Sequence, residues 1–306
     1  MRGLRGTYVL FGLLAAPLAG GETRAPAAIV VIASLGVEAH RSAIEGIQAA
    51  LAPASVEVRI LDVSQASGTT GPGLSATGAR VIIALGSEAT RVVESEQLKI
   101  PTVYAMILRR SPSREPQARA PVTIPLDVSL PDVVARLKEL FPGKTRLGII
   151  LNPASGGMSA EQLEARGQQL GFTVHVVPCA GAGQLLAAVA SLKHQADFVW
   201  CLPDGALFNS VTIKPLVLLS LENRLPLIGF SESFARAGAA IGIYADFREV
   251  GVEAGETARQ VLDGQNARPG DGPRRLKVAL NQSVLRLFGL RYAMGSGTAQ
   301  ESLVLP

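Results

Sequence analysis

The segment DFVWCLPDGALFNS, residues 197–210, indicates the fold more directly than any other part of the chain. An apolar run, residues 198–202, ends at Pro203 and is followed at once by the carboxylate of Asp204. A short apolar run bounded by turn residues is typical of a strand buried on both faces of a parallel sheet. The charge after it fits a catalytic acid, a metal ligand, a helix cap or a ligand-binding group, so the rest of the chain must decide.

The same alternation of apolar strand and helix extends in both directions from this segment. In the first half, strands are predicted at 28–34, 56–63, 80–86 and 101–108, and helices at about 39–51 and from 87 onward. In the second half, strands at 146–153, 172–179, 197–203 and 225–231 alternate with helices at 132–141 and about 159–170, 182–195 and 209–223. This alternation predicts two doubly wound α/β lobes, and the proline-containing segment 122–132 is the expected crossing between them.

Composition and charge exclude several classes of protein. The chain has 306 residues, of which 48% are hydrophobic and 18% charged, so it is expected to be globular and long enough for two domains. The net charge of +4 includes Arg2 and Arg5, without which 27 basic residues stand against 25 acidic ones. A net of +2 does not indicate a nucleic-acid partner.

The first twenty residues have the pattern of a secretory signal peptide. A basic start precedes a short apolar stretch, residues 7–18, and then small residues. We therefore expect residues 1–20 to be a signal peptide and the protein to be exported to the periplasm. The alternative is a buried N-terminal helix. No Cys follows the apolar stretch, so we do not expect a lipid anchor there.

Export would permit a disulfide between Cys179 and Cys201, the two cysteines of the chain. In a doubly wound lobe with strand order 2-1-3-4-5, the strands that carry them flank a third strand and lie roughly 10 Å apart. A disulfide needs Cα atoms within about 7 Å. We predict free, buried thiols, unless the loop after residue 178 folds back to allow the bond.

The motifs that could support catalysis are incomplete. GFSES, residues 229–233, resembles the nucleophile elbow of hydrolases, but it ends in Ser, and His40, His175 and His194 all precede it. No two histidines have i, i+4 spacing, and the chain has no phosphate-binding glycine loop. We therefore predict no catalytic residue, no metal site and no cofactor.

Polar residues recur where strands end and helices begin. These residues are Ser34, Gly86, Ser87 and Glu88 in the first half, and Asn152, Ser155, Asp204, Ser231 and Glu232 in the second. In open α/β sheets such positions line the ligand crevice. The helix N-termini beside them offer free N–H groups that suit a carboxylate. We predict that these residues bind a ligand; the alternative for each one is simple helix capping.

Several segments together resemble a known family. They are VIIALGSEAT (81–90), IPTVYA (100–105), GIILNP (148–153), residues 197–210, residues 225–264 and LKVALNQSVLRLFGL (276–290). In order and spacing they resemble ABC-transporter substrate-binding proteins of the tryptophan/tyrosine type, which have the type I periplasmic-binding-protein fold. The resemblance covers about residues 28–290 and is strongest after residue 145.

The resemblance implies two lobes joined by a hinge, with three crossings near 126–131, 244–246 and 266–274. The N-terminal lobe would comprise 27–127 plus 246–266. The C-terminal lobe would comprise 128–245 plus 273–290, and residues 291–306 would form a tail.

The function that the resemblance implies is capture of a small polar molecule, amino-acid-like or a small carboxylate, for an inner-membrane ABC permease. The protein would act as a monomer. Ser87 and the amides after Gly86 would hold the anionic end of the ligand, and Asp204 would take an amine or hydroxyl. Gly205 stands where the family has Asn, so aromatic specificity does not follow. The alternative is a periplasmic sensor or accessory binding protein that uses the same fold without transport.

Overall fold

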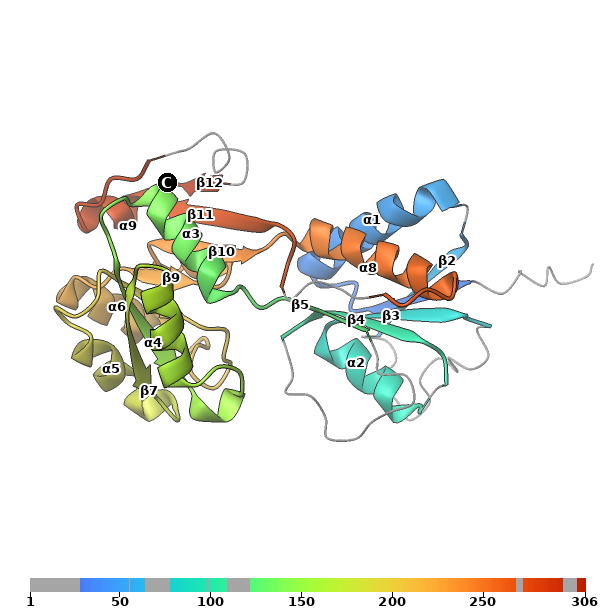
Figure 1. Ribbon diagram of the computed structural model, residues 1–306, viewed down its shortest axis with the longest axis horizontal. Coiled ribbons are helices and arrows are strands. Elements are labelled where there is room, and N and C mark those ends of the chain that lie inside the picture. The colour runs from blue at the N-terminus through green and yellow to red at the C-terminus, as the bar shows by residue number, and fades with distance from the viewer. Residues whose placement is uncertain are drawn as a thin grey trace, which may run out of the picture.

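The chain folds into two α/β lobes, each built on its own sheet (Figure 1). The computed structural model describes residues 28–54, 56–63, 78–97, 99–108, 122–267, 272–293 and 302–306. The predicted fold class, two doubly wound parallel-sheet lobes, is confirmed. The signal peptide predicted at 1–20 lies outside the described residues.

The first lobe has a five-stranded parallel sheet in the order β2-β1-β3-β4-β5. Its strands are β1 (Ile29–Ala33), β2 (Val58–Asp62), β3 (Val81–Leu85), β4 (Thr102–Ile107) and β5 (Val122–Pro125). Helix α1 (Glu38–Leu51) and the 3-10 turn η1 (Ala52–Ala54) follow β1, and α2 (Gly86–Ser95) follows β3. Helices α1 and α8 (Phe247–Leu262) cover one face of this sheet and α2 covers the other (Figure 1).

The second lobe has a seven-stranded sheet in the order β12-β11-β10-β9-β8-β6-β7. Its strands are β6 (Arg146–Leu151), β7 (Thr173–Pro178), β8 (Phe198–Cys201), β9 (Leu227–Gly229), β10 (Ile241–Ala245), β11 (Leu276–Asn281) and β12 (Ser302–Leu305). Its helices are α3 (Leu130–Leu140), η3 (Pro153–Ser155), α4 (Ala160–Gln169), α5 (Ala182–Ser191), α6 (Ile213–Asn223), α7 (Glu232–Arg236) and α9 (Gln282–Leu287). Only the β10–β11 pair, among the described strands, is antiparallel.

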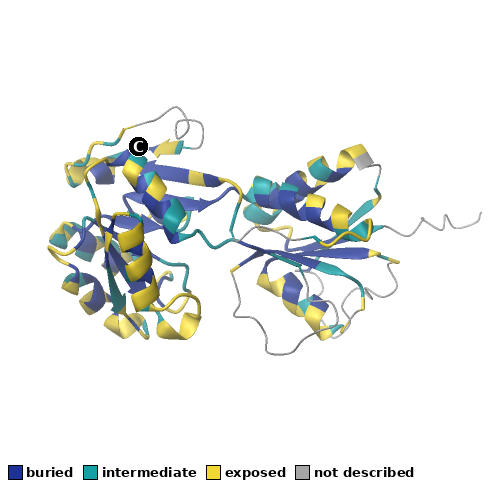
Figure 2. Ribbon diagram, in the orientation of Figure 1, coloured by how far each residue is buried: buried dark blue, intermediate teal, exposed yellow. Residues whose placement is uncertain are grey.

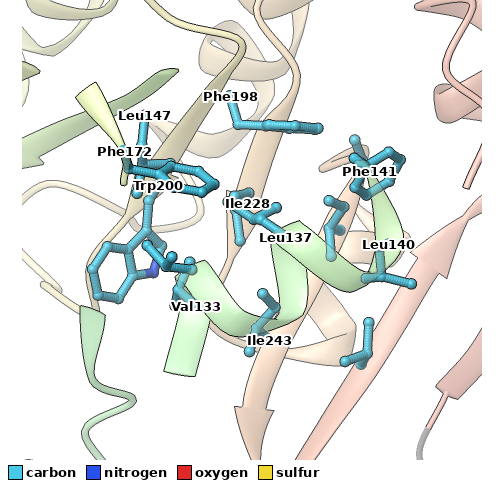
Figure 3. Packing of buried hydrophobic residues seen from close by; sticks show 14 of the residues in the cluster. Val133, Leu137, Leu140, Phe141, Leu147, Phe172, Phe198, Trp200, Ile228 and Ile243 are labelled. Carbon is cyan, nitrogen blue, oxygen red and sulfur yellow. The ribbon is translucent and has the colours of Figure 1, made fainter. Parts of the chain in front are cut away.

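The central strands β1, β3 and β8 are buried along their whole length, which explains their continuous apolar sequences, whereas the edge strand β2 is only partly buried (Figure 2). In the second lobe, Val133 and Leu137 of α3 lie one helical turn apart and point at the sheet (Figure 3). They meet a core that includes Trp200, which faces inward as expected, and Phe198, whose ring centroid lies 5.0 Å from that of Phe141. Alternate residues of β8, such as Cys201, face the α5 and α6 side instead.

The strand order explains the state of the two cysteines. Strands β7 and β8 flank β6, as the order 2-1-3-4-5 predicted. Cys179 and Cys201 are both free and buried, which confirms the prediction. Burial raises the pKa of the Cys201 thiol far above its usual range, so this sulfur stays protonated and unreactive.

The chain passes between the lobes three times: between β5 and α3, between β10 and α8, and between α8 and β11 (Figure 1). Helix α8 packs closely on α1 because glycines face the partner backbone. A Cβ at Gly251 would overlap the carbonyl of Ala43, and one at Gly46 would overlap the carbonyl of Arg248. Helix α8, which follows β10 of the second lobe in the chain, therefore packs in the first lobe.

Three segments differ from the sequence-based expectation. Residues 122–125, expected within a crossing, form β5 on the edge of the first sheet, where Pro125 is tolerated. Residues 302–305, expected in a tail, form β12 beside β11. The helix expected at about 209–223 begins only at Ile213, because Asn209 and Thr212 bond to each other's backbone in a preceding turn.

Candidate functional site

In each lobe, the carboxyl ends of the parallel strands lie at one edge of the sheet. The chain leaves for the other lobe from that same edge. β5 leads directly into the crossing to α3, and β1, β3 and β4 point the same way. β10 leads directly into the crossing to α8, and β6, β8 and β9 run parallel to it. The predicted site residues follow these strands, so they form one group at the crossing edge of each sheet.

In the first lobe, Ser34, the residue after β1, is hydrogen-bonded to the first turns of both α1 and α2. Its hydroxyl donates to Glu88 Oε2 at 2.9 Å, which ties it to the first turn of α2. Its backbone N–H donates to His40 Nδ1 at 3.3 Å, which ties it to the first turn of α1. Ser34 is buried, whereas Ser87 and Glu88 are exposed. The structure thus brings Ser34, Gly86, Ser87 and Glu88 to one edge, as the sequence predicted for each separately.

Gly86 allows this arrangement because it has no side chain. Its φ is +83°, a conformation that L residues rarely adopt, and a Cβ would lie 2.8 Å from His40 Nε2. The glycine at the start of α2 therefore lets the imidazole of α1 lie against the beginning of the neighbouring helix.

His40 was not among the predicted site residues, although it lies in the first turn of a helix that follows a strand. Because Nδ1 accepts the Ser34 N–H, the proton of the neutral ring resides on Nε2, beside Gly86. Burial lowers the pKa of His40, and the Glu88 carboxylate opposes that shift only in part. The ring is accordingly an uncharged group that organises this edge near neutral pH.

Helices α1 and α2 begin without a side-chain cap. Their N-cap residues are Val37 and Leu85, neither of which accepts a hydrogen bond from the helix. The first N–H groups of a helix then remain available to another acceptor, at the positive end of the helix dipole. In the second lobe, side chains cap η3, α4 and α7, whereas α5 and α6 also begin without a side-chain cap.

In the second lobe, Asp204 joins the loops that follow β6 and β8. Its Oδ2 accepts a hydrogen bond from Asn152 Nδ2 at 2.8 Å and another from the Ser155 hydroxyl. Its Oδ1 accepts from the backbone N–H groups of Ala206 at 2.7 Å and Leu207 at 3.1 Å. Both oxygens therefore accept two hydrogen bonds.

These contacts determine the charge and the role of Asp204. Partial burial disfavours the carboxylate, but the bonds from Ser155, Asn152 and the two backbone amides outweigh it and hold the pKa below its usual range. An ionised, fully accepting carboxylate has little capacity left for a ligand amine or hydroxyl. Asp204 instead fixes the amide of Asn152 and the hydroxyl of Ser155, and it caps the turn that follows β8.

Ser231 and Glu232 form a separate group at the start of α7. The Ser231 hydroxyl accepts the Phe234 N–H at 3.1 Å, which is ordinary helix capping. Glu232 pairs with Arg236 at 2.7 Å. Burial, together with Glu232, raises the pKa of Tyr244 to about 12, so this phenol keeps its proton. Capping thus explains Ser231 without a ligand.

Acidic residues at the start of α8 and along it pair with basic residues of the last crossing and of β11. Asp246 lies 3.4 Å from Lys277, and Glu249 lies 3.5 Å from Arg275. Arg274 contacts both Glu253, at 3.5 Å, and Glu256, at 2.5 Å. Glu253 is only 1% exposed, so its charge depends on a nearby cation. These ion pairs attach the segment that leads into β11 to α8, the helix that covers the first lobe.

Within the described ranges, no group of three or more His, Cys, Asp or Glu side chains is arranged to hold a metal ion. In the same residues, none of the helices has the length and apolar character needed to cross a membrane.

Comparison with known sequences identifies relatives. A profile of the family described as "ABC transporter substrate binding protein" matches residues 28–290. A tyrosine-binding protein from Clostridioides difficile (strain R20291) is 22% identical over 170 residues, which cover 54% of this chain and 48% of that protein. The matched part of the chain thus spans about half the length of this relative.

Comparison with solved structures shows the same fold. The ligand-free, open structure of a substrate-binding protein with adhesive properties from Clostridium difficile has a TM-score of 0.63 at 15% identity, covering 90% of this chain and 98% of that one. An ABC domain from Streptococcus pneumonia in complex with L-Trp has a TM-score of 0.56 at 18% identity, covering 90% and 99%. Both likenesses extend across the two lobes.

Proposed function

Since the chain belongs to the ABC transporter substrate-binding protein family, we propose that it is an exported protein that captures an amino-acid-like or small carboxylate ligand between its lobes. It then presents the ligand to an inner-membrane ABC permease. The observation that carries this proposal is the first-lobe edge, where two helices begin uncapped beside the exposed side chains of Ser87 and Glu88.

The first lobe binds the ligand's charged groups. The N–H groups at the start of α2 and the Ser87 hydroxyl hold the carboxylate, since this helix end supplies donors and positive potential without a competing cap. Glu88 takes the ammonium group of an amino acid through Oε1, since its Oε2 already accepts from Ser34. Opposite charges on adjacent groups match a zwitterion.

The second lobe completes the site when the lobes close. Asn152 and Ser155 supply an amide and a hydroxyl whose positions are fixed by Asp204. A ligand favours the closed arrangement only by as much as these additional contacts bind it more tightly in that state. The three crossings form the hinge, and the ion pairs between α8 and Arg274, Arg275 and Lys277 keep the third crossing attached during closure.

The names of the relatives support an amino-acid-like ligand, since one binds tyrosine and another was crystallised with L-Trp. Neither name fixes the side chain of the ligand here, and Gly205, next to Asp204, stands where the family has Asn.

A thermal-shift screen of the purified protein against amino acids, small carboxylates and sugars tests this function. A true ligand at one hundred times its Kd should stabilise the protein by about 2.7 kcal/mol. Ser87→Ala should weaken binding of that ligand, whereas Ser95→Ala, at the other end of α2, should not. Folded protein that responds to no compound would contradict the proposal. Small-angle scattering with and without the ligand should show a more compact particle when it is bound.

A further inference from the structure

The turn between β1 and α1 has apolar residues at positions that normally carry polar ones. The Ser34 carbonyl accepts the Val37 N–H at 3.1 Å, which closes the four-residue turn Ser34-Leu35-Gly36-Val37. Leu35 is 36% exposed and Val37 43% exposed. The second position of such a turn favours Pro but accepts most residues, whereas a helix N-cap favours Ser, Thr, Asp or Asn, so Val37 is the unusual choice.

Neither Leu35 nor Val37 belongs to a hydrophobic core cluster of the described residues. Val37, as the N-cap of α1, forgoes the side-chain hydrogen bond that a polar cap would make. The residue before it is Gly36, so the pair of apolar residues that often brackets a helix start is absent. When a residue departs from the preference of its local structure and gains no packing or hydrogen bond, the cause is commonly a functional contact.

The turn adjoins the donor groups of the proposed site. Ser34, its first residue, is bonded to Glu88, and His40 one turn further along α1 lies against Gly86. Leu35 and Val37 therefore lie on the same edge of the first lobe as Ser87 and the uncapped start of α2. An apolar surface next to a carboxylate-binding helix end suits a ligand with a charged head and an apolar side chain.

The second lobe has an apolar side chain at its own crossing edge. Met158 is 44% exposed and lies in the loop after β6, which also carries Asn152 and Ser155. Gly156 and Gly157 before it have φ values of +73° and +95°. A thioether on this loop is an adaptable apolar partner for a small ligand.

Aromatic side chains are placed elsewhere. In the part of the chain that the structure describes, no Phe, Tyr or Trp belongs to the exposed class. Near the carboxyl end of β9, the ring of Phe230 packs against Phe234, with centroids 5.3 Å apart, and against Phe208, at 6.1 Å. The exposed apolar side chains at the two edges are therefore aliphatic, and the partly buried ring of Phe230 is engaged with two other rings.

We infer that the ligand is an aliphatic α-amino acid whose side chain packs on Leu35 and Val37, with Met158 contacting it from the second lobe. This inference rests on the proposed function and adds the class of side chain to it. It predicts a selectivity that differs from that of the tyrosine-binding relative.

Isothermal titration calorimetry of the purified protein tests the inference with leucine, isoleucine, valine, alanine, tryptophan and tyrosine. Each methylene buried in the contact should lower the Kd about fourfold. Leucine should therefore bind at least about tenfold more tightly than alanine. Tryptophan and tyrosine should bind more weakly than leucine. If either aromatic amino acid binds as tightly as leucine, the inference is overturned while the proposed function stands.

Two substitutions test whether the turn residues determine the preference for leucine over alanine. Leu35→Ser and Val37→Ser should each weaken leucine binding severalfold and leave alanine binding nearly unchanged. Val37→Ser also restores a polar N-cap, so the variant should remain folded and melt no lower than the wild type. The control Leu218→Ser changes a 54% exposed residue of α6 and should leave the Kd for leucine unchanged. Unchanged leucine affinity in both turn variants would overturn the inference. If no amino acid binds the wild type but a small carboxylate does, the inference fails while the proposed function stands; if neither binds, both fail.

Discussion

The side-chain amide of Asn152 donates to the carboxylate of Asp204 at 2.8 Å, across 52 positions of the chain. This bond joins the loops after two neighbouring strands, β6 and β8. The same carboxylate holds Ser155 and two backbone N–H groups. Asp204, which the sequence suggested as a ligand contact, therefore fixes the positions of the polar groups around it.

Removing this carboxylate should loosen the second-lobe edge. Asp204→Ala leaves the Ala206 and Leu207 N–H groups and the Asn152 amide without their acceptor, so the free energy of unfolding should fall by about 1–3 kcal/mol. Urea denaturation measures this loss. The control Asp263→Ala, at the exposed end of α8, should change stability by less than about 0.5 kcal/mol. Equal losses in the two variants would show that the network contributes no stability.

The buried imidazole of His40 should make stability depend on pH. Its pKa in the folded protein lies below the value of about 6.5 in an unfolded chain. As pH falls through 6.5, the unfolded state takes up the proton first, so stability decreases until the pH reaches the folded pKa. His40→Gln removes this contribution. Its unfolding free energy, measured between pH 8 and pH 5, should fall less steeply than that of the wild type, and parallel curves would refute the prediction.

The contact between α1 and α8 should tolerate no added methyl group. Gly251→Ala places a Cβ on the Ala43 carbonyl, and the resulting helix displacement should cost about 1–3 kcal/mol. Gly255→Ala should cost less, since its Cβ would meet the methyl of Ala50 at 2.9 Å. As a control, Gly183→Ala in α5 meets nothing within 4 Å and should stabilise the helix by about 0.5–1 kcal/mol. Thermal unfolding of the three variants checks the order.

The ion pair between Arg274 and buried Glu253 should show strong coupling. Arg274→Ala leaves the Glu253 carboxylate without this cation and should cost about 3 kcal/mol. In the double variant with Glu253→Gln, the charge is gone, so much of the loss should be recovered. A double-mutant cycle by guanidinium denaturation measures the coupling. Strictly additive losses would mean that the pair contributes nothing specific.

The fold was largely predictable because buried parallel strands have an unambiguous sequence signature. The apolar runs at Ile29–Ala33, Val81–Leu85 and Phe198–Cys201 became strands within a few residues of the expected bounds. Strands β5 and β12 were missed because they are four residues long and lie at sheet edges, where pairing with a neighbour, and not local pattern, determines the conformation.

The site was predictable as a set of positions but not as a set of contacts. The ends of strands identified Ser34, Glu88, Asn152 and Asp204, since chain direction alone determines which edge they occupy. Sequence could not show that Asp204 is saturated by four donors, because two of them come from a loop about fifty residues earlier. His40 was missed because its role depends on the absence of a side chain at Gly86.

The placement of α8 also constrains how the protein can be synthesised and folded. α8 reaches α1 only after the strands β6 to β10 have been made, so the first lobe stays incomplete until late in synthesis. The second lobe needs β11, which follows α8. Folding of each lobe therefore depends on residues near the end of the chain, and these long-range contacts slow folding. A fragment that ends at Ala245 would leave one face of the first sheet covered by α1 alone, so neither lobe can be excised as a continuous segment.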